Sequence, residues 1–448
     1  MKTALTDKSW AVQRAATQVL IALHSSPDPI ALTTSEIEQV LAQSVKALDS
    51  VDRFTRQAHA RLTAHLLSES QVEGRKDLSS TMHSDSRQQK TKHDSDPADA
   101  DDPPSANAAS EQKSKPLLTP NEMLAYLSKE INKPNASRKT RIAIFEVYAA
   151  LFVALGPDWL ESNLSIVLQH LVADIVTHPR LTPPTLVTSA SAASSTAASA
   201  LLGNTARYER LLIRHLVSLL LRDLVELRML SEQGHISAIT DWASNHLKRW
   251  PAMMPGQAEP KESALVLALR QVGGLLVLLG NAPGIVQSAL SDPLVTLLSH
   301  PSHSVRINAA WALRCFCAST PLRLAKIILA LTDKLSTHLS ALTNPSSSQD
   351  TPQRVLGSAY GLAALVSLIP HRPWYVSYDV PTKIMDLAVV LLKKSGEHQV
   401  DVAGVEVEVA WRLMSGCMSL GKGFLRGYLP QLLVLWRNAL PKVVNIVS

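Results

Sequence analysis

The sequence has little cysteine and no long uninterrupted apolar run, and each shortage excludes a class of protein. Three cysteines in 448 residues exclude a disulfide-stapled scaffold and favour a reducing compartment. The stretch from Ala264 to Val286 is the longest apolar run, but Arg270 and Asn281 interrupt it, so we expect a buried helix and no transmembrane span. Hydrophobic residues nevertheless make up 46% of the chain, which is enough to build a large core.

The excess of charge of one sign is also small. The 44 Lys and Arg residues against 38 Asp and Glu residues give a formal net charge of +6. This excess does not indicate a nucleic-acid binder, in which we would expect one strongly basic face. The first residues, Met1 to Leu23, carry charges among their apolar positions and lack the apolar core of a signal peptide. We therefore expect a soluble intracellular protein that reaches membranes only indirectly, through other proteins.

Two stretches of low complexity divide the chain. Residues 69–116 have almost no branched apolar side chains, so they cannot bury enough surface to offset chain entropy and are predicted to be a disordered linker. Residues 181–204 combine Thr-Pro-Pro-Thr with an Ala/Ser tract, which predicts a long low-complexity loop. The remaining blocks, 1–68, 117–180 and 205–448, are predicted to consist of HEAT-type helical repeats.

Helical spacing dominates these three blocks. Apolar residues recur every three or four positions, whereas the alternation typical of strands occurs only at Val402–Val409. Pairs such as Gly156-Pro157 and Asp292-Pro293 are expected at helix starts, ends or kinks. The predicted helices span residues 8–24, 34–49, 52–68, 120–131, 137–155, 159–177, 206–230, 235–249, 261–280, 284–299, 303–319, 322–341, 353–369, 382–394, 401–420 and 424–438.

The predicted helices also repeat in pairs. A Val or Phe followed four positions later by Ala occurs near the start of four of them, at Val12, Phe54, Val305 and Val355. Two helices per unit of about 40–50 residues predict an all-α fold, an α-solenoid of HEAT-type antiparallel helix pairs forming a superhelix. The best single unit is Leu294–Ser319, and an irregular helical bundle is the alternative.

The first and last predicted helices lack a partner. Met1–Leu23 resembles the second helix of a repeat, and Tyr428–Leu440 resembles a first helix. Because the open end of a solenoid exposes apolar surface, we expect the chain to be a piece of a longer array or to lie against another chain. For the same reason we expect it to self-associate.

One motif suggests nucleotide chemistry. Gly416-Cys-Met-Ser-Leu-Gly421-Lys422 has the spacing of a P-loop, in which backbone amides and a lysine cradle phosphates. However, Gly423 stands where a Ser or Thr should hold magnesium, and a helix is predicted where a strand should precede the loop. We interpret the motif as a helix C-terminus at which Gly421 and Gly423 turn the chain.

Metal and catalytic sites are not indicated either. Cys315 and Cys317 follow His303, but residues two apart on a helix point about 200° away from each other, so we interpret both as buried structural cysteines. Histidines are scattered without a catalytic constellation. We therefore predict no enzyme activity, no cofactor and no metal site. Core or inter-repeat packing is the interpretation for Trp159, Trp242, Trp250, Trp311, Trp411 and Trp436.

Two groups of basic residues form the candidate partner surface. The first group opens a predicted helix, and the second is spaced three and seven residues apart on one face of another. They could bind an acidic partner or a phosphoinositide. The alternative is a solvated face that forms pairs with Glu209 and Asp223 on its own helix. The six residues are Arg138, Lys139, Arg141, Arg207, Arg210 and Arg214.

The stretch from Pro134 to Asn163 reads PNASRKTRIAIFEVYAALFVALGPDWLESN. In this stretch the chain resembles the N-terminal part of the HEAT repeat-containing protein 5 family, whose fungal members are called large clathrin-adaptor accessory proteins. His300–Cys317 agrees as well, and so does Tyr428–Pro441, which contains Leu-Leu-Val-Leu-Trp-Arg-Asn. The similarity spans about residues 117–441.

The resemblance implies a non-enzymatic scaffold for clathrin-adaptor-dependent vesicle traffic between endosomes and the trans-Golgi network. It also implies protein partners, namely the clathrin adaptor complex of these membranes and accessory subunits like aftiphilin and gamma-synergin. The implied location is cytoplasmic and peripheral, at Golgi and endosomal membranes and clathrin-coated vesicles. No nucleic-acid partner is expected.

Because a fold does not fix a function, a karyopherin-like carrier or a chromatin- or nucleic-acid-associated subunit is the alternative. A carrier would need an acidic inner face with ordered Trp-Asn arrays. The sequence shows Asn308 before Trp311 but no repeated array.

Overall fold

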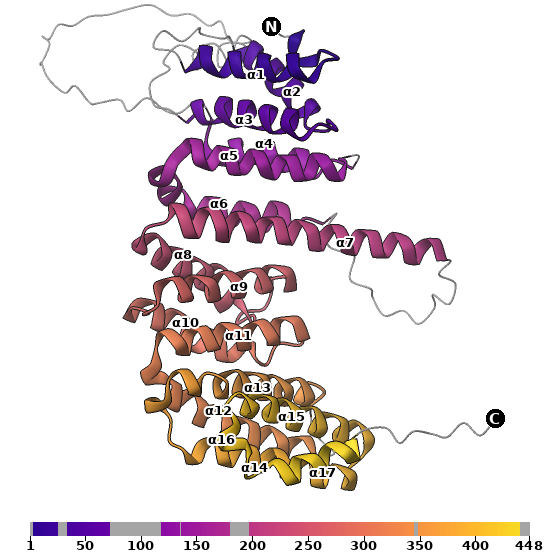
Figure 1. Ribbon diagram of the computed structural model, residues 1–448, viewed down its shortest axis with the longest axis vertical. Helices are drawn as coiled ribbons and strands as arrows, with labels where there is room; N and C mark the ends of the chain where they lie inside the picture. Colours follow the sequence, from indigo (N-terminus) through magenta and orange to yellow (C-terminus); the bar gives the residue numbers. More distant parts are fainter. Residues whose placement is uncertain are drawn as a thin grey trace, which may run out of the picture. The chain divides into compact units, whose positions relative to one another are not determined.

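The computed structural model describes residues 3–25, 34–71, 118–134, 136–179, 197–344 and 348–439. Every regular element within these ranges is helical (Figure 1), which confirms the predicted all-α solenoid. The chain divides into two compact units, Met1–Leu220 and Leu221–Ser448. Most of the predicted linker (residues 72–116) and of the predicted loop (residues 181–196) lies outside the described residues.

The first unit stacks its odd-numbered helices. Helix α3 packs against both α1 and α5, while α2 packs on α3 and α4 on α5. Its helices are α1 (Trp10–His24), α2 (Thr34–Ala47), α3 (Arg53–Glu69), α4 (Pro120–Ile131), α5 (Arg138–Ser162), α6 (Leu164–His170) with a π-helical continuation (Leu171–Val176), and α7 (Ala197–Leu219), after a short 3₁₀ turn at Ala4–Thr6.

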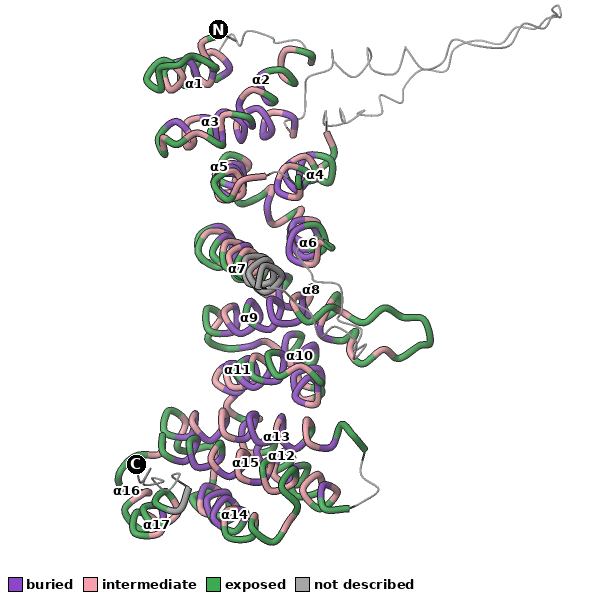
Figure 2. Tube along the Cα trace, turned by 90° about the vertical axis from the view of Figure 1, so that its right-hand side faces the viewer, coloured by how far each residue is buried: buried purple, intermediate pink, exposed green. Residues whose placement is uncertain are grey.

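The second unit has the same plan. Helices α9, α11, α13 and α15 pack one on the next, and α8, α10, α12 and α14 pack against them; Figure 2 shows α9 and α11 side by side, with α10 beside them. The π-helical segment Leu220–Met229 leads into it. Its helices are α8 (Glu232–Asn245), α9 (Glu262–Leu279), α10 (Gly284–Leu297), α11 (His303–Ser319), α12 (Pro321–Leu342), α13 (Thr351–Val366), α14 (Asp379–Lys394), α15 (Val400–Met418), α16 (Lys422–Leu425) and α17 (Leu429–Ala439), with 3₁₀ turns η4 (Leu247–Arg249), η5 (Ile369–His371), η6 (Pro373–Tyr375) and η7 (Ser395–Glu397).

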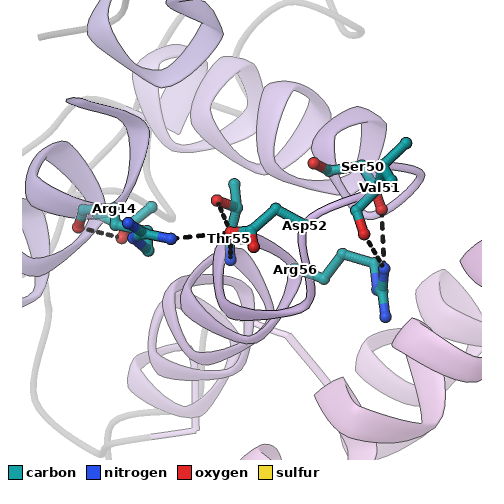
Figure 3. A network of polar contacts seen from close by, with 7 residues as sticks. Arg14, Ser50, Val51, Asp52, Thr55 and Arg56 are labelled. Atoms are coloured by element: carbon teal, nitrogen blue, oxygen red, sulfur yellow. Dashed lines mark hydrogen bonds and ion pairs between the residues drawn. The ribbon is translucent and has the colours of Figure 1, made fainter. Parts of the chain in front are cut away.

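Side-chain caps fix several helix starts. Figure 3 shows Asp52, the N-cap of α3, whose carboxylate accepts from the backbone N–H and the hydroxyl of Thr55 at 2.8 and 2.6 Å and from Arg14 of α1 at 2.9 Å. Arg56 donates to the carbonyls of Ser50 and Val51 at 2.9 and 3.1 Å. These bonds satisfy amides and carbonyls that the end of a helix leaves unpaired, and the arginine of α1 ties two helices together.

The Val or Phe that opens the repeat motif is buried in two of its four copies. Val305 and Val355 are fully buried between neighbouring helices. Val12 and Phe54 are 40% and 67% exposed instead. In α3 the buried face begins one residue later, at Thr55, because the Asp52 cap turns the Thr55 hydroxyl inward. The motif therefore marks helices, but it does not fix which face is buried.

One stretch predicted as a loop is partly helical, and two proline-containing pairs lie inside helices. Helix α7 begins at Ala197, inside the stretch predicted as a loop, because alanine has the highest helix propensity and supports the first turns. The kink expected at Gly156-Pro157 lies inside α5, where Gly156 has a φ of 82°. Pro293 lies inside α10, as in the predicted helix over residues 284–299.

Among the residues that the structure describes, two helices, α5 and α9, have the length and apolar composition of a membrane span. Each is packed within its unit, α5 against α3 and α9 against α11. In the most apolar 18-residue stretch of each helix, the rest of the protein buries 39% of the residues in α5 and 61% in α9. Such burial is typical of core helices, so length and composition alone are weak grounds for a membrane span.

Candidate functional site

The structure brings the two predicted basic groups together across helices α5 and α7. Arg138, at the start of α5, donates to the hydroxyl of Tyr208 on α7 at 3.0 Å, and its guanidinium lies 4.9 Å from the centre of that ring. Arg141 donates to the carboxylate of Glu209 at 2.6 Å. The side chain of Arg141 is only 13% exposed. The first turn of α5 is therefore held against α7 by paired basic side chains.

The remaining predicted residues differ in exposure. Lys139 and Arg207 are exposed, whereas Arg210 and Arg214 are partly buried. Glu209 pairs with Arg141 of the neighbouring helix, and Asp223 pairs with Arg222 beside it at 3.1 Å. Sequence spacing could not show the pair of Glu209 with Arg141, since it joins residues far apart in the chain. The side chains that offer positive charge to a partner are chiefly Arg138, Lys139 and Arg207.

A buried hydrogen-bonded chain in the first unit has the residue types of a catalytic relay. The Tyr148 hydroxyl and Nε2 of His170 are 2.8 Å apart, and Nδ1 of His170 lies 2.8 Å from Asp174. Burial lowers the pKa of His170 although Asp174 raises it. Tyr148 is fully buried, and burial raises its pKa well above the usual value. A substrate cannot reach this hydroxyl. We therefore interpret these hydrogen bonds as structural contacts that hold α5 against α6.

A second polar cluster joins three helices of the second unit. The hydroxyl of Tyr360 on α13 donates to Glu408 of α15 at 2.5 Å. The ring of Tyr360 meets the ring of His303 on α11 edge-on at 5.5 Å, and the guanidinium of Arg412 lies 5.2 Å from its centre. Burial, reinforced by Glu408, raises the pKa of Tyr360 to about 12. Sequence reasoning missed this cluster because no local spacing relates its residues.

The motif with P-loop spacing does not have the geometry of a P-loop. Gly416 lies inside α15, where a Cβ atom would come within 2.7 Å of the Ala363 carbonyl oxygen, so this glycine serves the packing of α13 on α15. Gly421 has a φ of 89° and turns the chain after the C-terminus of α15, as predicted, and it is also the N-cap of α16. Gly423 does not turn the chain, since it lies within α16. The motif is preceded by a helix, whereas a P-loop requires a strand before it.

The cysteines are buried and unpaired. Cys315, Cys317 and Cys417 are free thiols in the core, as predicted. Burial raises the pKa of Cys315 to about 11 and those of Cys317 and Cys417 to about 12, so the three remain protonated near neutral pH. Among the described residues, no group of three or more His, Cys, Asp or Glu side chains is arranged to hold a metal ion.

The tryptophans follow the packing prediction only in part. Trp242 is buried, and Trp311 lies over Gly273 of α9 while remaining 39% exposed. Trp436 of α17 is 53% exposed, so it does not lie in the core.

Comparison with known proteins finds a match to a repeat family and a distant relative. Residues 285–314 match the armadillo/beta-catenin-like repeat, which corresponds to α10 and the first part of α11 and overlaps the repeat unit predicted at Leu294–Ser319. Protein SWEETIE of Arabidopsis thaliana is 29% identical over 183 residues, which are 39% of this chain and 8% of that protein. The chain thus matches only a small part of the relative's length.

Together, the helix pairs and the comparisons support a helical-repeat scaffold of armadillo or HEAT type. Such a solenoid typically binds other proteins along its helix faces and has no catalytic role. No enzymatic family is indicated by these comparisons.

Proposed function

We propose that this chain is part of a non-enzymatic scaffold for clathrin-adaptor-dependent vesicle traffic between endosomes and the trans-Golgi network. The observation that carries the proposal is the resemblance of Pro134–Asn163 to the HEAT repeat-containing protein 5 family. Most of this stretch forms α5, the central helix of the first unit. Its apolar face packs inward, whereas Arg138 and Lys139 lie at the surface.

The proposed partners are the clathrin adaptor complex of these membranes and accessory subunits like aftiphilin and gamma-synergin. The exposed basic side chains at the start of α5 and in the middle of α7 suit an acidic segment of such a partner. A net charge of +6 would hold the chain only weakly on an anionic membrane. The proposed location is therefore cytoplasmic and peripheral at Golgi and endosomal membranes and clathrin-coated vesicles, through protein contacts.

Imaging and co-purification test this proposal. A tagged full-length protein should lose its punctate Golgi and endosomal location when the adaptor is depleted. The double variant Arg138→Glu, Lys139→Glu should co-purify with several-fold less adaptor than the matched variant Lys8→Glu, Lys129→Glu, which changes two exposed lysines of the same unit. Unchanged puncta, or tight binding of the purified protein to protein-free liposomes at physiological salt, would contradict the proposal.

The carrier alternative finds less support. On α11, Asn308 accepts from the guanidinium of Arg270 at 3.0 Å, and Trp311 packs over Gly273. Arg314 lies one turn further along the same helix. A basic neighbourhood of this kind would repel basic cargo, whereas a karyopherin-like carrier needs an acidic face.

A further inference from the structure

Along the stacked helices α9, α11 and α13 of the second unit runs a strip of exposed apolar and basic side chains. Ile307 and Trp311 on α11 are 42% and 39% exposed, and Val277 on α9 is 64% exposed. The ring of Trp311 lies over Gly273 of α9, where a Cβ atom would come within 2.1 Å of it, so this contact fixes the place of the ring. The α11 strip consists of Arg270, Val277, Ile307, Trp311 and Arg314.

Two arginines of the α11 strip are oriented by neutral acceptors. Nε of Arg270 donates to the side-chain oxygen of Asn308 at 3.0 Å, and Nε of Arg314 donates to the hydroxyl of Ser367 on α13 at 3.1 Å. Within the described residues, neither guanidinium pairs with a carboxylate, and the Nη groups of both have no hydrogen-bond partner. These Nη groups can bind both oxygens of one carboxylate.

Carboxylates are scarce around the α11 strip. Helices α11 and α13 contain no Asp or Glu, and α9 contains only Glu262, its first residue. Glu408 on α15 already accepts from the hydroxyl of Tyr360 at 2.5 Å. Glu226 lies beneath Gly274 of α9, but burial raises its pKa to about 8, so it is mostly uncharged at neutral pH. The positive charge of the two arginines is therefore not neutralised within the strip.

The spacing of the two guanidiniums suits an extended chain. Asn308, which holds Arg270, and Arg314 are six residues apart on α11, or about 9 Å along its axis. Arg270 lies where α9 meets α11, and Arg314 lies where α11 meets α13. Because packed helices are about 8–10 Å apart, the two charges are separated by on the order of 13 Å. Side chains four residues apart in an extended chain point the same way and are also about 13 Å apart.

We propose that the α11 strip binds an extended acidic segment of a partner protein. Two carboxylates four residues apart pair with Arg270 and Arg314, and an apolar side chain midway between them packs on Trp311. Tryptophan and arginine are the side chains that most often dominate binding energy, and side chains already held in place lose little freedom on binding. The inference rests on the proposed scaffold function and names the chemistry of one partner site.

A protein segment is favoured over an anionic membrane as the occupant. Lipid surfaces are attracted by clusters of about four to eight basic residues, whereas the α11 strip has two. Asn308 and Ser367 also hold the two guanidiniums in fixed directions, which selects a ligand with a fixed distance between its charges.

Fluorescence anisotropy with the purified full chain tests the strip. The probe is a fluorescein-labelled peptide, Gly-Ser-Glu-Ser-Leu-Ser-Glu-Ser-Gly. Three comparison peptides replace both Glu by Gln, replace the Leu by Ser, or place the two Glu next to each other. The wild-type chain should bind the probe at least tenfold more tightly than the Gln peptide and at least threefold more tightly than the other two.

Variants of the strip locate the binding. Arg270→Gln, Arg314→Gln should bind the probe at least tenfold more weakly than the wild type. The matched control Arg426→Gln, Arg437→Gln removes two exposed arginines outside α9, α11 and α13 and should change the affinity less than twofold. Arg270→Lys, Arg314→Lys keeps both charges and should still bind several-fold more weakly, because lysine cannot form the bidentate pair. Circular dichroism checks that each variant is folded.

Equal affinities for the probe and the Gln peptide, or equal losses in the strip variant and its control, would overturn the proposal. It would also be overturned if the wild type bound no peptide but bound phosphatidylserine vesicles, and Arg270→Gln, Arg314→Gln abolished that binding. Co-purification of the adaptor is measured separately. A chain that binds the probe without the adaptor would refute the proposed function alone, and the reverse result would refute the strip proposal alone.

Discussion

Glu226 carries a carboxyl group into the core of the second unit, where it is 2% exposed. The side-chain amide of Gln271 donates to its two oxygens at 2.8 and 3.3 Å. Burial raises the pKa of Glu226 to about 8, although Arg222 opposes the shift. Near neutral pH the folded protein therefore keeps a proton on Glu226 that the unfolded chain, with a pKa near 4.5, has released.

This difference predicts how stability depends on pH. Between about pH 4.5 and 8 the native state binds one proton more than the unfolded state, so the free energy of unfolding falls as pH rises and levels off above the folded pKa. Glu226→Gln keeps a neutral group beside Gln271 and removes this loss. We expect the variant to exceed the wild type at pH 9 by on the order of 3 kcal/mol more than at pH 5. Urea titrations at the two pH values measure the difference.

Glu397→Gln is the control, because Glu397 is exposed on η7 of the same unit. It should leave the pH dependence of unfolding unchanged. A slope for Glu226→Gln equal to that of the wild type would show that Glu226 is ionised in the native state.

At the scale of the helix pair, glycine decides how closely two helices approach. A Cβ atom at Gly357 would overlap the Leu298 carbonyl, whereas one at Gly404 of α15 would meet no atom within 4 Å. Gly357→Ala should therefore lower the free energy of unfolding by about 1–3 kcal/mol or more, because α13 must move away from α10. Thermal or urea unfolding followed by circular dichroism measures the change.

Gly404→Ala is the matched substitution, and it should raise the free energy of unfolding instead of lowering it. Gly404 is an exposed position inside a helix, where alanine is favoured by about 0.5–1 kcal/mol. Destabilisation by both substitutions to the same extent would mean that helix approach at Gly357 is not the determining contact.

At the scale of the whole molecule, exposed apolar stripes predict self-association. Leu429, Leu433 and Trp436 follow one face of α17 and are 52%, 55% and 53% exposed. Light scattering of the purified chain should show a mass that rises with concentration. Leu429→Asp, Leu433→Asp should reduce this rise, because charges replace the stripe.

The control is Leu322→Asp, Leu329→Asp, two exposed leucines on α12. It should leave the association unchanged if α17 is the contact. A wild-type chain that stays a monomer at high concentration would show that the exposed stripe does not drive association.

Helical periodicity in the sequence predicts only part of the candidate surface. The basic residues Arg138 and Arg207 could be predicted as surface positions, since helical periodicity assigns faces. Their arrangement depended on Tyr208 and Glu209, which the fold brings to α5 from a distant helix. The cluster at Tyr360 was not predicted, because its residues come from three helices without a shared local pattern.

The sequence alone determined the all-helical class and most helix boundaries. Apolar spacing and capping residues act within a few positions, so α4 at Pro120–Ile131 and α11 at His303–Ser319 have the predicted bounds. Only the tertiary structure decided which faces are buried and which charges are paired. Phe54 is exposed and Glu226 is buried because burial depends on the helix that packs opposite, and that neighbour lies beyond the range of any local pattern.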